Sequence, residues 1–389
     1  MKITDVRVLP YEHDLDRRLG DVNAPDGFGR VALSAVFVDT DEELTGVSVG
    51  SPAAGAVLGV LRECLLGEDP RSVRGLWQRM VDVAFKGGNA GIMCDGISSL
   101  DCALWDLRAK ANGVPLWKEL GATRNRVKAY ASGLDSPLTD DALRDFYARM
   151  AADGISAGKL KVGHNTDDDL RRLSIVKDAL RVNDSRPALM IDSNEYWSPK
   201  QAVRRIREFE QGFDLVWAEE PAQRWDYRGL REVRRGIAAA VATGENLDNV
   251  HQYVPLVEHE AVDVVQIGWG TSGITGALKV AELAYAFDLQ VSLMNCPGHF
   301  TAHLGAALPN HTMMEVIGAG RDAAFTSANR IEDGFIVLGE VPGIGIAFDD
   351  AKLEEFASAF GRGDTIGSTY RRGAGAGVHE GTKRPFERD

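Results

Sequence analysis

Three acidic residues recur at a regular interval in the middle of the chain. Asp192 lies in LMIDSN, Glu219 in VWAEEP and Glu245 in ATGEN. Intervals of about 26 residues correspond to one strand–helix unit of a β/α barrel, so successive strands would bring the carboxylates together at their carboxyl ends. Converging carboxylates repel one another unless a cation neutralises them. Oxygen ligands of this kind suit Mg²⁺, with Mn²⁺ as an alternative, and the pattern predicts a divalent metal site.

Each acid on its own has a structural alternative, because a single carboxylate at a strand end can cap a helix or pair with an arginine. Three acids at successive intervals favour the metal site over that alternative. Glu220 follows Glu219 directly and would point to the opposite face of the strand. We interpret Glu220 as an ion-pair partner, although a shift of one residue in the strand would exchange the two.

Two lysines precede the first acid by one strand, in Lys159-Leu160-Lys161. Residues two apart share a face of a strand, so both lysines would point into the barrel if Leu160 faces the helices. The alternative is a pair of solvated lysines on an exposed strand. Two ammonium groups beside a divalent cation lower each other's pKa, which gives a neutral amine that can accept a proton. With a metal to stabilise the enediolate, this set predicts removal of the proton α to a carboxylate.

The surrounding sequence supplies the strands that such a site requires. Short apolar runs end in polar residues at intervals of 20 to 31 positions and alternate with amphipathic segments, as in a (β/α)₈ barrel. Ser198 and Pro199 predict the start of one helix. The eight candidate strand ends are Tyr130–Gly133, Lys159–Val162, Ile191–Asn194, Trp217–Glu220, Thr243–Asn246, Val264–Gln266, Val291–Asn295 and Met314–Val316.

The sequence before the barrel has a different organisation. Apolar residues at helical spacing between Met93 and Ala111 follow three strand-like runs, and a polar loop is expected from about Glu12 to Arg30. The fold class is therefore α/β, a modified TIM barrel with an N-terminal α+β capping domain. The predicted divisions are 1–120 for the capping domain, 121–330 for the barrel, 331–360 for a segment that returns to the capping domain, and 361–389 for a flexible or subunit-contacting tail.

The composition of the chain argues against two classes of binding partner. The formal net charge of −13 argues against nucleic acid and anionic membranes as partners. No run is long enough to span a bilayer, and Asp5 and Arg7 make the first apolar stretch unlike a signal peptide. Four scattered cysteines favour a reducing compartment. We expect a cytoplasmic protein that binds a small carboxylate substrate.

Motifs over nearly the whole chain before the tail resemble the enolase superfamily, in its mandelate racemase and muconate lactonizing enzyme branch. They are GISSLDCALWDLRAKANGVPLWKELG, KLKVG, DSN, EEP, GEN, SGITG and VPGIGIAF. The resemblance implies Asp192, Glu219 and Glu245 as ligands of Mg²⁺. It implies Lys161 as the catalytic base and Lys159 as the partner of the substrate carboxylate. It also implies a homo-oligomer.

Further residues take roles from the same resemblance. Asn194 matches a polar residue that follows the first ligand, and we expect it to contact the substrate. Glu315, in MMEV, matches an acid that hydrogen-bonds the enediolate, although a buried acid paired structurally is an equal alternative.

The chain departs from the family's pattern on the other side of the barrel. Racemase-type members carry Asp after the sixth strand and His after the seventh, and cycloisomerase-type members carry Lys on the sixth. Here Gly268 and Asn295 fall at those positions, and neither exchanges a proton at a useful pKa. Asn295 remains a candidate for substrate binding. His299 could enter the site as a general acid through a loop shift, or could be an ordinary loop histidine.

A site with a base on one face favours dehydration of a hydroxy acid, most simply a sugar acid. The polar segment from Glu12 to Asp26 and the stretch Phe85–Asn89, including Lys86, suit a hydroxylated substrate. The enzymatic alternative is a racemase, epimerase or cycloisomerase with a second partner for Lys161. The alternative outside enzymes is a metal-binding barrel without activity.

Overall fold

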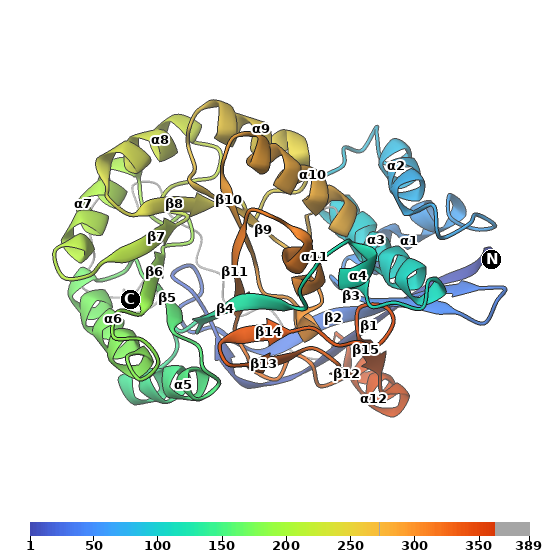
Figure 1. The fold of residues 1–389 in the computed structure, drawn as a ribbon, viewed down its shortest axis with the longest axis horizontal. Coiled ribbons are helices and arrows are strands. Elements are labelled where there is room, and N and C mark those ends of the chain that lie inside the picture. The colour runs from blue at the N-terminus through green and yellow to red at the C-terminus, as the bar shows by residue number, and fades with distance from the viewer. Residues whose placement is uncertain (272, 362–389) are drawn as a thin grey trace.

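The computed structural model describes residues 1–271 and 273–361 (Figure 1). The chain begins with an antiparallel sheet in the order β1-β2-β3, and helices cover it. These elements are β1 (Ile3–Leu19), β2 (Phe28–Thr40), β3 (Thr45–Gly50), α1 (Ala54–Glu63), α2 (Val73–Val83), α3 (Ile92–Ala111) and α4 (Leu116–Glu119). The predicted capping domain of α+β type is confirmed.

The helix α3 joins this domain to the rest of the molecule. It is buried on nearly all sides, packing on β3 and on α10 (Gly273–Ala286) of the barrel. Trp105 Nε1 donates to Thr275 Oγ1 at 2.9 Å, and Thr275 N donates to Asp101 Oδ2 at 2.8 Å. Gly113, with φ of +67°, follows the end of the helix. The helical pattern predicted between Met93 and Ala111 is thus confirmed.

Eight parallel strands form a closed barrel, because β11 pairs with β4 as well as with β10. All eight predicted strands are present. Their bounds are β4 (Arg126–Ser132), β5 (Ala157–Lys161), β6 (Ala188–Asp192), β7 (Leu215–Glu219), β8 (Ala240–Thr243), β9 (Val264–Ile267), β10 (Gln290–Leu293) and β11 (His311–Val316).

The barrel helices lie outside these strands (Figure 1). The bounds are α5 (Asp140–Ala152), α6 (Thr166–Leu180), α7 (Pro199–Glu210), α8 (Tyr227–Gly236), α9 (Val250–Glu258), α10, the 3₁₀ turn η1 (Pro297–His299) and α11 (Ala302–Ala307). The Ser198 side chain accepts from Gln201 N, and Pro199 takes the first helical position of α7, as predicted.

A small apolar cluster fills the barrel interior below the strand ends. Tyr130, Met190, Trp217 and Met313 are its largest members, and the rings of Tyr130 and Trp217 meet edge to face at 5.3 Å. This cluster gives the polar side chains above it a rigid, water-excluding floor.

After the barrel the chain forms four short strands and a helix, β12 (Phe325–Ser327), β13 (Arg330–Glu332), β14 (Phe335–Val337), β15 (Ile346–Phe348) and α12 (Asp350–Ala359). β14 pairs with β4 at the barrel. α12 packs on β1 in the capping domain, where the rings of His13 and Phe356 lie 5.1 Å apart. Apart from Gly361, the tail predicted over residues 361–389 lies outside the described residues.

The polar loop expected over Glu12–Arg30 is shorter than predicted. β1 continues to Leu19 and β2 begins at Phe28, so only residues 20–27 form a loop, which we call the lid loop. Asp16 N donates to Ala319 O at 3.1 Å, and Arg17 Nη2 donates to Ile317 O at 2.8 Å. Backbone groups of Ile317 and Ala319, which are far away in sequence, bind these residues of β1. These contacts explain why β1 stays extended where the sequence predicts a loop.

Within the described residues, no helix combines the length and apolar character that a membrane crossing requires.

Candidate active site

The lysines of β5 point into the barrel mouth, as their spacing predicts. Lys159 Nζ lies 3.3 Å from Asp192 Oδ2 and 3.0 Å from Glu315 Oε1, and it also pairs with Glu219. Lys161 Nζ lies 2.5 Å from Asp192 Oδ2. Lys159 is 0% exposed and Lys161 is 5% exposed. The strand places both lysines on one face because residues two apart share a side.

Strand pairing brings the first two acids next to these lysines. Lys161 pairs in register with Asp192, and Asp192 pairs in register with Glu219. Glu245 follows β8 after Gly244, whose φ of +128° turns the chain at the strand end. The structure therefore gathers Asp192, Glu219 and Glu245 at the carboxyl ends of three successive strands.

Neighbouring residues orient two of these carboxylates. Glu219 Oε2 accepts from Trp217 Nε1 at 3.1 Å and from Gln266 Nε2 at 2.6 Å. Asp192 Oδ1 accepts from Asn194 N at 2.8 Å. Such second contacts fix the direction in which a carboxylate presents its remaining lone pairs.

Carboxylates outnumber ammonium groups in this cluster. Burial and the charge of Asp192 raise the pKa of Glu219 well above its usual range. Burial and Glu220 raise the pKa of Glu245 to about 8. Burial also acts to raise the pKa of Asp192, but Lys161 outweighs it and lowers that pKa. Glu219 and Glu245 are therefore held in the protonated, neutral form near pH 7, and a bound cation would favour their ionised form.

This donor set fits a hard divalent cation in chemistry and in charge. Three carboxylates converge, and the Oδ1 atom of Asn194 is buried close by without a hydrogen-bond partner. In the described part of the chain, no three acid, histidine or cysteine side chains stand in a ready metal-binding arrangement. Lys161 contacts a carboxylate oxygen of Asp192, and Lys159 contacts one of Glu219, so both lysines occupy oxygens that a cation would use.

The pKa of Lys161 shifts in the direction opposite to the one expected beside a cation. Burial acts to lower this pKa, but the Asp192 carboxylate outweighs it and raises the pKa above its ordinary value. The same holds for Lys159, where Glu219 and Glu315 overcome the effect of burial. Both lysines therefore remain protonated as long as the carboxylates are the charges closest to them.

Glu220 does not form the ion pair predicted for it among the described residues. It is 1% exposed, and it accepts from Asn246 Nδ2 at 2.8 Å and from Asn194 Nδ2 at 3.4 Å. Its φ of +42° turns the chain out of the strand. Burial and the charge of Asp192 raise its pKa to about 8. Glu220 therefore belongs to the carboxylate cluster through two amides.

Gly268 and Asn295 hold the two positions at which the family resemblance leads one to expect an acid, a histidine or a lysine. A Cβ atom on Gly268 would lie 2.5 Å from Glu245 O, so no side chain fits there. Asn295 donates through Nδ2 to Glu315 Oε2. Burial acts to raise the pKa of Glu315, but Lys159 and Lys161 outweigh it and lower the pKa to about 2. Glu315 is therefore an anion held between Lys159 and Asn295.

His299, expected as a second acid, lies in η1 beyond Asn295 rather than among the lysines. Burial lowers its pKa, and the nearest charges are Asp322, which opposes that shift, and Arg321. Its Nδ1 atom is buried without a hydrogen-bond partner. Lys86 is exposed on the loop after α2 and joins none of the contacts of the carboxylate cluster in the described residues. Asn194, in contrast, meets the lid loop, because Asn23 Nδ2 donates to Asn194 O at 3.0 Å.

Family models match both parts of the molecule. Residues 28–121 match the "Mandelate racemase / muconate lactonizing enzyme, N-terminal domain", and residues 142–352 match the "Enolase C-terminal domain-like" model. The chain belongs to the mandelate racemase and muconate lactonizing enzyme branch of the enolase superfamily. The resemblance inferred from the motifs is confirmed.

Individual relatives of this branch cover nearly the whole chain. The 3,6-anhydro-alpha-L-galactonate cycloisomerase of Streptomyces coelicolor is 34% identical over 91% of this chain and 99% of its own. A racemase structure from the same species, with bound magnesium, is 30% identical with a TM-score of 0.84, covering 91% of this chain and 99% of that one. The L-talarate/galactarate dehydratase of Salmonella typhimurium, liganded with Mg and L-lyxarohydroxamate, is 26% identical with a TM-score of 0.84, covering 91% and 92%.

Several residues that support this enolase-type site were missed by sequence reasoning. Asp135 Oδ1 accepts from Lys161 N at 3.2 Å, and Tyr147 OH donates to Lys159 O at 2.5 Å. Both hold the backbone of the lysine strand. Gln266 interrupts the apolar run VVQI, and that polar residue inside a barrel strand was a usable signal. Asp135 sits in a loop and carried no comparable signal.

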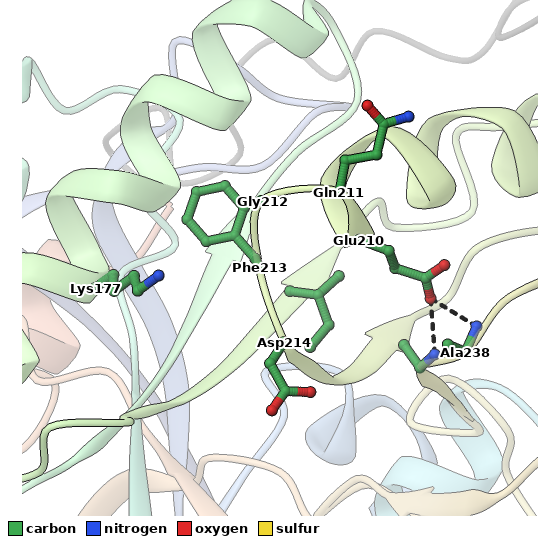
Figure 2. Close-up of a pocket in the computed structure, with 9 residues that line it drawn as sticks. Lys177, Glu210, Gln211, Gly212, Phe213, Asp214 and Ala238 are labelled. Atoms are coloured by element: carbon green, nitrogen blue, oxygen red, sulfur yellow. Dashed lines mark hydrogen bonds between the residues drawn. The ribbon is translucent and has the colours of Figure 1, made fainter.

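A separate hollow of about 500 Å³ lies at the other end of the barrel, before the start of β7 and β8 (Figure 2). Glu210 accepts there from Ala238 N at 2.7 Å and from Ala239 N at 2.8 Å. Lys177 Nζ lies 5.2 Å from the centre of the Phe213 ring. The polar groups of this hollow thus serve loop structure, and active sites of β/α barrels lie at the opposite end.

Proposed function

We propose that this chain catalyses Mg²⁺-dependent removal of the proton α to a carboxylate, followed by loss of a β-hydroxyl group as water. The observation that carries the proposal is Lys161, which lies on the interior face of β5 at 2.5 Å from Asp192, the first acid of the ligand set. No structural role requires two buried lysines among these acids, since a simple core would omit all of them.

The chain's own residues can account for each proton. Lys161 Nζ accepts the α-proton, and the Lys159 ammonium offsets the charge of the substrate carboxylate. A divalent cation bound by Asp192, Glu219 and Glu245 would stabilise the enediolate charge. The bond from the β-carbon to oxygen then breaks, and the departing hydroxide takes the proton back from Lys161. The enol product becomes a 2-keto-3-deoxy acid, so water is the only other product.

The test is exchange of the α-proton in D₂O, followed by NMR with Mg²⁺ across a panel of acid sugars. We expect exchange with at least one acid, and loss of about 100-fold or more in Lys161→Ala, because general base catalysis contributes that much. Lys200→Ala, an exposed lysine of α7, is the matched control. Circular dichroism checks that the variants fold.

Two outcomes contradict the proposal. Full exchange in Lys161→Ala would show that another group is the base. Absence of exchange with every acid would favour a metal-binding barrel without activity.

A second candidate, an epimerase or cycloisomerase, rests on a different observation. His299 lies beside Asp322 at the mouth and has an unpartnered, buried Nδ1. A histidine with an adjacent carboxylate can deliver a proton to the face opposite Lys161. Exchange that inverts the α-carbon, or ring opening without release of water, would identify this reaction, and His299→Asn should then abolish it.

Other expectations remain proposals of this kind. We place Asn194, Asn295 and Lys86 at the substrate, the first two because they border the acids. The buried cysteines Cys102 and Cys296 form no disulfide bond among the described residues, which supports a reducing, cytoplasmic location. We also propose a homo-oligomer, as the family resemblance implies.

A further inference from the structure

Arg224 is a partly buried cation in the loop after β7, and the proposed reaction does not use it. Its side chain is 24% exposed, and that of its partner Glu195 is 16% exposed. Arg224 Nε donates to Glu195 Oε1 at 2.5 Å, and Arg224 N donates to the same oxygen at 3.2 Å. Arg224 Nη1 donates to Asn246 O at 2.8 Å. One arginine thus joins its own loop to two others, and we call Arg224 with these contacts the loop clamp.

Each of the three loops that the loop clamp joins follows one of the proposed metal ligands. The pairs, each ligand with the residue of the loop clamp that follows it, are Asp192 with Glu195, Glu219 with Arg224, and Glu245 with Asn246. The contacts of the loop clamp therefore cross the mouth of the barrel just outside the three carboxylates.

Strand pairing positions two of the ligands but not the third. Asp192 is the last residue of β6 and Glu219 is the last residue of β7, and the two pair in register. Glu245 lies beyond the end of β8, outside the strand pairing, and it is partly exposed. Its position relative to the other two acids therefore depends on loop contacts. The loop clamp supplies one of these contacts, because it holds Asn246, the residue next to Glu245.

The backbone of these loops requires such contacts. Asn194, Glu195 and Glu220 have φ values of +42°, +61° and +42°. Residues with a side chain rarely adopt this left-handed conformation, and it persists where the surroundings hold it. Glu195 N donates to Glu220 O at 2.9 Å, and the loop clamp holds the side chain of the same glutamate. Both contacts oppose relaxation of the loop that follows Asp192.

The loop clamp differs from an ordinary surface ion pair. Arg186 and Asp214, at the other end of the barrel, are both exposed and lie 3.0 Å apart, and exposed pairs of this kind contribute little. Arg224 is mostly buried and directs two nitrogens of one guanidinium group to two loops. The donors of a guanidinium group have a fixed planar geometry, so they set the distance between the groups that accept from them.

We propose that the loop clamp sets the spacing of the three carboxylates for an ion of the size of Mg²⁺ and thereby discriminates against Ca²⁺. Mg²⁺ demands nearly octahedral geometry with ligands at about 2.0–2.1 Å, whereas Ca²⁺ accepts flexible geometry at about 2.3–2.6 Å. A rigid spacing therefore favours Mg²⁺, and a loosened one removes that advantage. Arg224 is a positioning residue in this scheme, since it acts on the metal through the loops. The inference rests on the ligand set of the proposed function.

The test is calorimetric titration of the metal-free protein with MgCl₂ and, separately, with CaCl₂. We expect Arg224→Met to weaken Mg²⁺ binding by about 10- to 100-fold, as loss of a contact that orients metal ligands does. Ca²⁺ binding should weaken by less than about threefold, because Ca²⁺ tolerates an altered spacing. Arg186→Met, at the exposed pair with Asp214, is the matched control and should leave both affinities unchanged.

A second variant tests the loop clamp from the other side of the contact. Glu195→Gln keeps the shape of the side chain and removes its charge, so it should lower the ratio of Mg²⁺ to Ca²⁺ affinity in the same direction. The double variant should lose little more Mg²⁺ affinity than Arg224→Met alone, because both changes remove one shared contact. If Arg224→Met does not fold, as circular dichroism would show, Glu195→Gln alone decides the ratio.

A merely structural role for Arg224 has a different signature. It would lower the thermal stability of the metal-free protein and leave the ratio of the two affinities unchanged, and that result would overturn the inference. Unchanged Mg²⁺ affinity in both variants would also overturn it. If the ratio depends on Arg224 as expected while no acid exchanges its α-proton, the proposed function fails and the loop clamp stands.

Discussion

At the scale of single residues, the lysines and the expected cation use the same oxygens. Lys161 is bound to Asp192 and Lys159 to Glu219, and these carboxylates hold both side chains as ammonium groups. If a cation also bound the Asp192 carboxylate, Lys161 would lose much of the interaction that raises its pKa. Occupation of the acids and release of a neutral amine would therefore be linked events.

Gln266 gives a residue-scale prediction. Its amide donates to Glu219 Oε2 at 2.6 Å and is 0% exposed. Gln266→Leu keeps a similar volume but removes a contact that orients a ligand, so we expect Mg²⁺ affinity to fall by about 10- to 100-fold. Titration calorimetry measures this affinity. Gln290→Leu, at the exposed first residue of β10, is the control, and unchanged affinity in Gln266→Leu would contradict the orienting role.

At the scale of elements, the hairpin of β1 and β2 closes over the site through its lid loop. Gly20 N donates to Leu134 O at 2.8 Å, and Asn23 reaches the loop of the first acid. A Cβ atom on Gly20 would lie 2.4 Å from Ala24 O and 2.8 Å from the Cα of Gly27. The lid loop therefore has no room for a larger residue at this point.

Gly20→Ala should displace the lid loop from the barrel. We expect a higher KM and faster proteolytic cleavage within residues 20–27, because the loop loses its docked conformation. Gly29→Ala is matched to it on the same hairpin, since its nearest atom lies 3.6 Å away. Equal cleavage rates in both variants would show that docking at Gly20 does not control the lid loop.

The strands and loops also differ in how well the sequence predicts them. Barrel strands were readable because each one is a short apolar run ending in a polar residue, and Asp192 and Glu219 fall at such ends. The extension of β1 was not readable, since its polar residues bind backbone groups near Ile317, some 300 positions away.

At the scale of the whole molecule, His303 lies where the capping domain, barrel and return strands meet. It is 1% exposed, accepts from Trp117 N through Nδ1 at 3.0 Å, and lies 3.2 Å from Asn329 Oδ1 through Nε2. Burial lowers its pKa to about 4. The histidine is therefore neutral in the folded protein at pH values where the unfolded chain binds a proton.

This difference predicts an acid-sensitive junction. The unfolded chain takes up the proton near pH 6.5 and the folded protein only near 4, so stability present above pH 6.5 is lost as the pH falls to 4, by up to about 3 kcal/mol. His303→Gln should reduce this loss, and thermal denaturation at several pH values measures it. His251→Gln, at an exposed position, should leave the slope unchanged, and an equal slope in both variants would contradict the assignment.

The contact between β1 and α12 has a consequence for synthesis of the chain. Besides the rings of His13 and Phe356, Gly361 N donates to Glu12 Oε2 at 3.2 Å. Ribosomes add about 5–20 residues per second, so α12 follows β1 out of the exit tunnel by roughly 15 to 70 seconds. During that delay the face of β1 that α12 covers has no native partner and is open to chaperones. A nascent chain that stops before Asp350 never covers it.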